Sequence, residues 1–159
     1  MKKFARFHIV DAEPMSFGSW CTSCSKLVPD GADPAKEGYR VIYPDGYVSW
    51  CPKDAFEAAG RPIDGMTFGM AIEAMKRGEK VARKGWNGKG MWLCIPLVEG
   101  PKEIPASGVW GKPNAEYAKK NGGTVKVMPY ITMKAADGSI VMGWLASQTD
   151  MLSEDWEIV

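Results

Sequence analysis

The sequence predicts an α+β protein of two small antiparallel-sheet domains, each with one main helix. Two hairpin patterns indicate the antiparallel sheets, because each places a Gly-containing turn between two apolar runs. One apolar stripe, made by Phe68, Ile72 and Met75, has the i, i+4, i+7 spacing of a helix. A Pro- and Gly-containing segment at 61–65 separates the two patterns. We therefore expect domains at 1–64 and 65–159.

The first domain is predicted to open with a strand over 5–10, followed by a loop over 19–36 that is rich in Ser, Pro, Gly and Asp. Two strands, 39–43 and 47–50, then flank Pro-Asp-Gly, in which Pro presets φ and Gly tolerates positive φ. A short helix should follow, with Pro52 in its first turn and Phe56 on its buried face.

The second domain should begin with the main helix, capped by Thr67 and ended by Gly78. Residues 96–126 are rich in Pro and Gly and have little apolar periodicity, so we expect a long loop there. The remaining elements are strands 80–83 and 91–95 around a glycine-rich turn at 84–90, a hairpin of 130–134 and 140–144, a helix-start box at 147–150 and a last strand at 155–159.

Composition narrows the possible functions. The chain has 159 residues and a formal net charge of +1, from 20 basic and 19 acidic residues. Proteins that bind duplex nucleic acid are normally strongly basic, so we do not expect that partner. No apolar run approaches the roughly 20 residues that a membrane span needs. Charged residues interrupt the N-terminal segment, so we expect an intracellular protein with reduced cysteines.

A zinc site is one possibility that the cysteines raise. Cys21 and Cys24 have zinc-ligand spacing, Cys51 offers a third thiolate, and His8 is the single histidine. The alternative is that they are incidental reduced thiols on a loop, since a second ligand pair is absent. We expect neither a metal nor another cofactor.

Catalytic patterns are sparse in this sequence. With one histidine, no Ser-His or Cys-His relay stands out, and there is no P-loop or dinucleotide fingerprint. Asp150 and Asp155 are the nearest pair of acids, and at this spacing near a helix start they are expected to cap or hold water rather than act as acid and base. We therefore do not expect an enzyme.

The glycine-rich turn is the first candidate for ligand binding. Residues 76–89 contain six basic residues and one acid. Backbone N–H groups exposed by glycine can hold an anion, and the Arg83 guanidinium can bind a phosphate. Trp86 offers a stacking face and Asn87 can pair with a base edge. The alternative is a plain hairpin turn with Trp86 folded into the core.

The second candidate is the polar run Ser147, Gln148, Thr149 and Asp150, which follows Trp144. Its alternative interpretation is a helix N-terminal cap, and the two roles can coexist.

The same residues carry a resemblance to the second type of Thoeris anti-defence protein, a phage and prophage family. It covers about residues 65–159, with the motifs in family order, whereas the content of 97–126 departs from the family. The matching motifs are Thr-Phe-Gly-Met-Ala-Ile-Glu-Ala-Met-Lys at 67–76, Ala-Arg-Lys-Gly-Trp-Asn-Gly at 82–88, Pro-Tyr-Ile at 129–131, Trp-Leu-Ala-Ser-Gln-Thr-Asp at 144–150 and Glu-Asp-Trp at 154–156.

The resemblance implies a non-catalytic protein that sequesters cyclic ADP-ribose-type signals made by bacterial TIR enzymes, and in some members cyclic dinucleotides. It also implies homotetramers with pockets between protomers, acting in the cytoplasm of the infected host. The residues that it assigns to the ligand are Trp86, Asn87, Trp144, Ser147, Gln148, Thr149 and Asp150, with Phe68 and Arg83 as further candidates.

Residues 1–64, with the hairpin at 43–50, resemble a small phage module of unknown role that usually lacks these cysteines. Two other functions stay open. In one, the N-terminal hairpin docks another protein and the tryptophans only form core. In the other, the protein hydrolyses the nucleotide signal.

Overall fold

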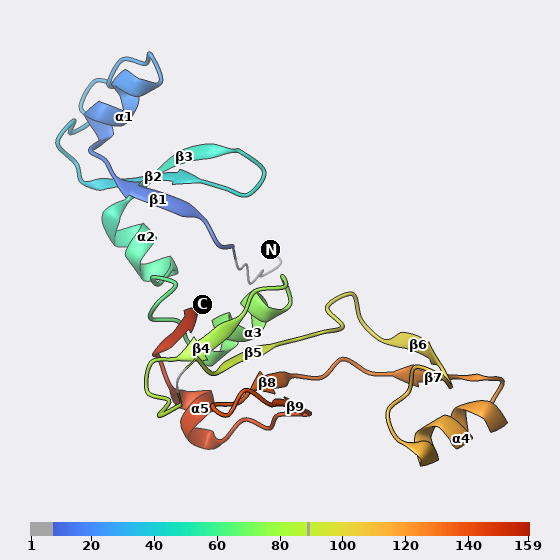
Figure 1. Ribbon diagram of the computed structural model, residues 1–159. Helices are drawn as coiled ribbons and strands as arrows, with labels where there is room; N and C mark the ends of the chain where they lie inside the picture. The colour runs from blue at the N-terminus through green and yellow to red at the C-terminus, as the bar shows by residue number, and fades with distance from the viewer. Residues whose placement is uncertain (1–7, 89) are drawn as a thin grey trace. The chain divides into compact units, whose positions relative to one another are not determined.

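The chain divides into two compact units, Met1–Ile63 and Asp64–Val159 (Figure 1). The computed structural model describes residues 8–88 and 90–159. Helices and antiparallel sheets occur in both units, which confirms the predicted α+β class. Within the described residues, no helix is both long enough and apolar enough to span a membrane.

Unit 1 is built on a three-stranded antiparallel sheet in the order β1-β2-β3. The strands are β1 (Asp11–Pro14), β2 (Gly38–Ile42) and β3 (Val48–Pro52). The predicted β2-β3 hairpin is confirmed, and Gly46 takes a φ of 82° in its turn. Helix α2 (Lys53–Ala59) follows directly, as predicted, but Pro52 is its N-cap residue and the last residue of β3 rather than a residue of its first turn. Its Phe56 ring stacks on Tyr39, with centroids 4.5 Å apart.

Two predictions for unit 1 need correction. Residues 5–7 of the predicted first strand lie outside the described residues, and 8–10 form no strand, because pairing with β2 begins only at Asp11. The loop predicted over 19–36 is wrong in its first part, where α1 (Phe17–Ser23) forms. Ser16 caps this helix by accepting from the backbone N–H of Ser19 at 3.3 Å, and Cys21 is the buried residue of the helix.

Unit 2 is built on a five-stranded antiparallel sheet in the order β10-β4-β5-β8-β9. The last strand of the chain therefore lies beside β4 (Figure 1). These strands and the two helices nearest to them are β4 (Val81–Arg83), β5 (Trp92–Cys94), β8 (Thr132–Lys134), β9 (Ile140–Met142), β10 (Trp156–Ile158), α3 (Phe68–Met75) and α5 (Gln148–Leu152). All of them occur where the sequence predicts them, within a few residues at their ends.

The core of unit 2 lies between α3 and the sheet. Met75, Val81, Leu93 and Trp156 are each fully buried there. Thr67 caps α3 as predicted, accepting from the backbone N–H of Met70 at 3.4 Å. The helix ends at Met75, three residues before Gly78.

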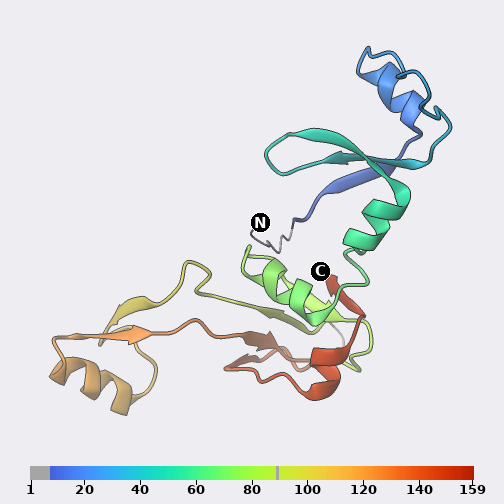
Figure 2. The same cartoon turned by 180° about the vertical axis from the view of Figure 1, so that it is seen from behind.

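The loop predicted over 96–126 is the main error. It contains β6 (Lys102–Pro105), α4 (Lys112–Lys120) and β7 (Thr124–Val127), which together we call the arm. Strands β6 and β7 pair with each other and not with the five-stranded sheet. Figures 1 and 2 show α4 packed beside this hairpin. Pro113 in the first turn of α4 and buried Ala118 explain why a helix forms here.

Candidate functional site

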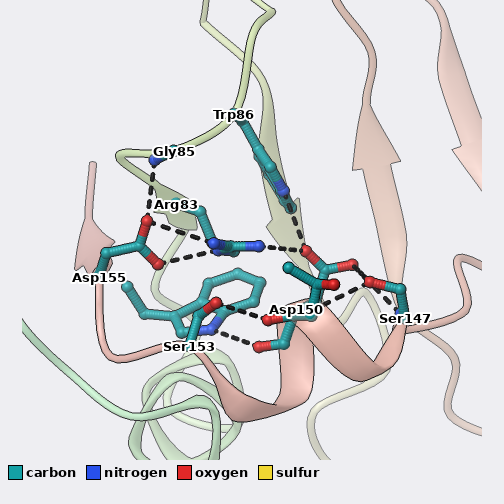
Figure 3. A network of polar contacts seen from close by, with 9 residues as sticks. Arg83, Gly85, Trp86, Ser147, Asp150, Ser153 and Asp155 are labelled. Carbon is teal, nitrogen blue, oxygen red and sulfur yellow. Dashed lines mark hydrogen bonds and ion pairs between the residues drawn. The ribbon is translucent and has the colours of Figure 1, made fainter.

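Arg83, the last residue of β4, holds two carboxylates together (Figure 3). Its Nη1 donates to Asp150 Oδ1 at 2.9 Å, and its Nε donates to Asp155 Oδ1 at 2.8 Å. The side chains of Arg83 and Asp150 are only 12% and 14% exposed. The backbone N–H of Gly85 also donates to Asp155, at 2.9 Å. The start of the glycine-rich turn is thus fixed to the segment just before β10.

Asp150 is the acceptor that connects this ion-pair cluster to α5. Its Oδ1 also accepts from Trp86 Nε1 at 3.2 Å. Its Oδ2 accepts from the Ser147 hydroxyl at 2.7 Å, while Ser147 Oγ accepts from the Asp150 backbone N–H at 3.1 Å. The backbone N–H of Ser147 also donates to Asp150 Oδ2, at 3.2 Å. This bond and the one from the Asp150 backbone N–H to Ser147 Oγ form a capping box, which confirms the helix-start box predicted at 147–150.

These contacts control the charges of the cluster. Burial raises the pKa of Asp150, but hydrogen bonds from Ser147, Arg83 and Trp86 outweigh that effect and lower it to about 2. The Arg83 guanidinium lowers the pKa of Asp155, and the two carboxylates raise that of Arg83. All three groups are therefore charged at neutral pH, and one cation faces two anions.

The lowered pKa of Asp150 predicts acid-sensitive stability. Its unfolded-state pKa is about 3.9, so the ionised form stabilises the fold above that pH, and this contribution disappears as pH falls through about 2. We expect the free energy of unfolding to be constant above about pH 5 and to lose about 2 kcal/mol from this group between about pH 4 and 2. Denaturant unfolding across this range measures the loss.

The matched variant for this measurement is Asp150→Asn, which keeps the size of the side chain but cannot titrate. It should be less stable at neutral pH and should lose less stability on acidification than the parent protein. An equally steep loss in both proteins would assign the acid sensitivity to other carboxylates.

Four aromatic side chains pack against one another beside the ion-pair cluster: Phe68, Trp86, Trp144 and Trp156. Trp156 is fully buried, and its ring centroid lies 5.3 Å from that of Phe68 and 5.4 Å from that of Trp86. Its Nε1 donates to the Asp150 carbonyl at 3.0 Å. Trp144 lies 6.2 Å from Trp86 with the rings inclined at 65°. Trp86, Trp144 and Phe68 keep part of their surface exposed. Trp86 is therefore neither a free surface residue nor a fully buried core residue.

The structure thus gathers six of the nine candidate residues into one network: Phe68, Arg83, Trp86, Trp144, Ser147 and Asp150. The other three, Asn87, Gln148 and Thr149, are exposed beside it along the chain. Their contacts with a ligand stay predictions. The bond between Arg83 and Asp155 was not predicted, since the two residues are far apart in the sequence and no local motif connects them.

A hollow of about 320 Å³ also adjoins the glycine-rich turn. Arg83 and Trp86 line it, whereas Trp144 and residues 147–150 do not. Its other walls come from β4, β5, β10 and their flanking residues: Lys80, Ala82, Lys84, Gly88, Gly90, Met91, Trp92, Glu157 and Val159. The candidate residues therefore do not all line one cavity of this chain.

The cysteines do not gather as a zinc site would require. Over 8–88 and 90–159, no three His, Cys, Asp or Glu side chains form a group that could hold a metal ion. All four cysteines are free thiols.

A family model and a known protein both match the second unit of this chain. The family model of the Thoeris anti-defense 2-like domain matches residues 66–159. Thoeris anti-defense 2 of Bacillus phage SP01 is 38% identical over 95 residues, which cover 59% of this chain and 94% of that protein.

Proposed function

The chain belongs to the Thoeris anti-defense 2-like family through residues 66–159, and on this basis we propose how it counters Thoeris defence. Unit 2 binds a cyclic ADP-ribose-type signal, such as glycocyclic ADP-ribose, and removes it from solution without cleaving it. Cyclic dinucleotides are a second ligand class. The protein acts as a homotetramer in the cytoplasm of the infected host, with pockets between protomers.

The observation that best supports binding is the fixed position of Trp86. Its N–H is bonded to Asp150 and its ring lies against Trp144 and Trp156. A stacking surface that is already oriented loses little conformational entropy when a ligand arrives. Exposed Asn87, Gln148 and Thr149 lie beside this network along the chain and bring groups that can hydrogen-bond to a base or ribose.

Arg83 plays a supporting part in this proposal. Its guanidinium is mostly buried and bonded to two carboxylates, and one cation between two anions does not favour a phosphate. We assign it the role of holding Asp150, and through Asp150 the indole of Trp86.

The state of Asp150 supports binding without turnover. With a pKa of about 2 it is ionised at neutral pH and has no proton to donate to a leaving group. Its oxygens already accept from Ser147, Arg83 and Trp86, which makes it a poor general base as well.

The test is a depletion experiment. Purified protein is mixed with glycocyclic ADP-ribose and filtered, and the retained protein is heated to release what it holds. Chromatography then compares the free, released and input compound. We expect the free compound to be depleted and the released compound to be intact.

Each other outcome contradicts the proposal in its own way. Depletion with an altered product would make the protein a hydrolase of the signal. If neither this compound nor a panel of cyclic dinucleotides were depleted, unit 2 would instead be a protein interaction module.

A further inference from the structure

The chain contains three asparagines, Asn87, Asn114 and Asn121, and the first and last of them are followed by glycine. An asparagine before glycine readily loses its side-chain amide, because glycine has no Cβ to hinder the approach of its backbone nitrogen to the asparagine side chain. The local structure decides which asparagine can react, since the side chain must be free to turn towards the next peptide nitrogen.

Two of the three asparagine side chains are held by hydrogen bonds in the arm. Asn114 Nδ2 donates to the Trp110 carbonyl at 2.8 Å, and Asn121 Nδ2 donates to the Tyr117 carbonyl at 2.8 Å. Asn114 also lies within α4, and the N–H of the next residue, Ala115, already donates to a backbone carbonyl. Each of these side chains must therefore break a hydrogen bond before it can react.

Asn87 has no such restraint. It lies in the irregular turn between β4 and β5, and its side chain is exposed. Among residues 8–88 and 90–159, this side chain forms no hydrogen bond, and the backbone N–H of Gly88 donates none. Asn87 is therefore the asparagine that combines a following glycine with an unrestrained side chain.

We propose that Asn87 is a site of spontaneous deamidation and that the deamidated protein no longer holds the ligand. The Gly88 backbone nitrogen attacks Cγ of Asn87, a C–N bond forms, and the side-chain nitrogen leaves as ammonia with the proton of the Gly88 N–H. Water then opens the cyclic imide. Breaking its bond to Cγ gives aspartate, and breaking its bond to the main-chain carbonyl carbon gives isoaspartate. One water is consumed and one ammonia is released, with no oxidation or reduction.

Either product changes the glycine-rich turn beside Trp86. Both carry a new carboxylate, which repels the phosphates of an ADP-ribose-type ligand. Isoaspartate also adds a methylene to the main chain, and the turn has little room for it. A Cβ added at Gly88 would overlap the Met91 side chain and lie 2.9 Å from Ala136 Cβ. The loss of binding rests on the proposed function, whereas the deamidation itself does not.

The first test follows the amide of each asparagine in the full chain. The folded protein is incubated in a mildly alkaline buffer and digested under acidic conditions, and mass spectrometry quantifies aspartate and isoaspartate at the three positions. We expect Asn87 to react first. Asn121 should react roughly 2- to 12-fold more slowly, because its hydrogen bond to Tyr117 must break beforehand. In denaturant, which removes this bond, the rates at Asn87 and Asn121 should become similar.

The second test connects the modification to binding. Fresh and incubated protein are titrated with glycocyclic ADP-ribose, and the number of binding-competent sites should fall in proportion to the Asn87 amide that is lost. Asn87→Asp reproduces one of the two products and should bind at least about threefold more weakly. The matched control, Asn121→Asp, adds the same charge in the arm and should bind normally.

Three results would overturn the inference. Asn87 could keep its amide in the folded protein while the denatured protein loses it. Asn121 could react as fast as Asn87 in the folded protein. Protein deamidated at Asn87 could bind as much ligand as fresh protein. If fresh protein binds no ligand, the proposed function and the predicted loss of binding fall together, while the mass measurement still decides whether Asn87 is the modified residue.

Discussion

Replacing Arg83 with methionine should destabilise unit 2 by about 3 kcal/mol, the largest loss that we expect from one substitution. The variant leaves Asp150 and Asp155 facing each other with no cation, and Asp150 is almost buried. Removing one member of a buried ion pair costs much more than the net value of the pair, since the remaining charge has lost both water and its partner.

Denaturant unfolding, monitored by tryptophan fluorescence, measures this loss of unfolding free energy, because five of the seven tryptophans belong to unit 2. The control is Arg40→Met in unit 1. Arg40 pairs with Glu13 at 3.0 Å, but the two side chains are 32% and 57% exposed, so we expect a loss below about 1 kcal/mol. Equal losses in the two variants would show that the Arg83 cluster behaves as an ordinary surface pair.

Replacing Trp86 with alanine should weaken ligand binding by roughly 5- to 150-fold, which corresponds to the 1–3 kcal/mol of one stacked base. The variant should still fold, because Trp86 is partly exposed while fully buried Trp156 keeps the aromatic cluster together. Isothermal titration with glycocyclic ADP-ribose measures the affinity, and circular dichroism checks the fold.

Two further variants separate stacking from general loss of aromatic surface. Trp86→Phe keeps a ring but loses the hydrogen bond to Asp150, so its affinity should lie between those of the parent and the alanine variant. Trp110→Ala removes a tryptophan of the arm that is 75% exposed, and it should bind normally. A folded Trp86→Ala protein with full affinity would remove Trp86 from the site.

The parts of the fold that the sequence predicts correctly have strong local signals. The hairpin at Gly46 needs a residue that accepts a φ of 82°, and Thr67 and Ser147 are good N-terminal caps. The signals in the arm are short. Pro113 at the start of α4 and the alternation of Thr, Val, Lys and Val over 124–127 each cover only a few residues, and α4 buries only Ala118, so they do not stand out between the nearby glycines and prolines.

The sequence motifs contain the residues of this network but do not predict the contacts between them. Trp86 and the run at 147–150 stand out as motifs. The bond between Arg83 and Asp155, however, forms because β10 pairs with β4. No local sequence pattern predicts which strands become neighbours in a sheet. The sequence therefore suggests that the Arg83 guanidinium is available to a phosphate, whereas the structure shows it bonded to two carboxylates.

The pairing of β5 with β8 affects how this chain can evolve and be engineered. Cys94 and Thr132 are direct partners, so the segment between them leaves and re-enters the sheet at adjacent points. An insertion that starts and ends at neighbouring points can be lengthened, shortened or exchanged without shifting the register on either side. The arm can therefore vary in length and sequence while the five-stranded sheet stays intact, and the same junction offers a place to graft a fluorescent reporter.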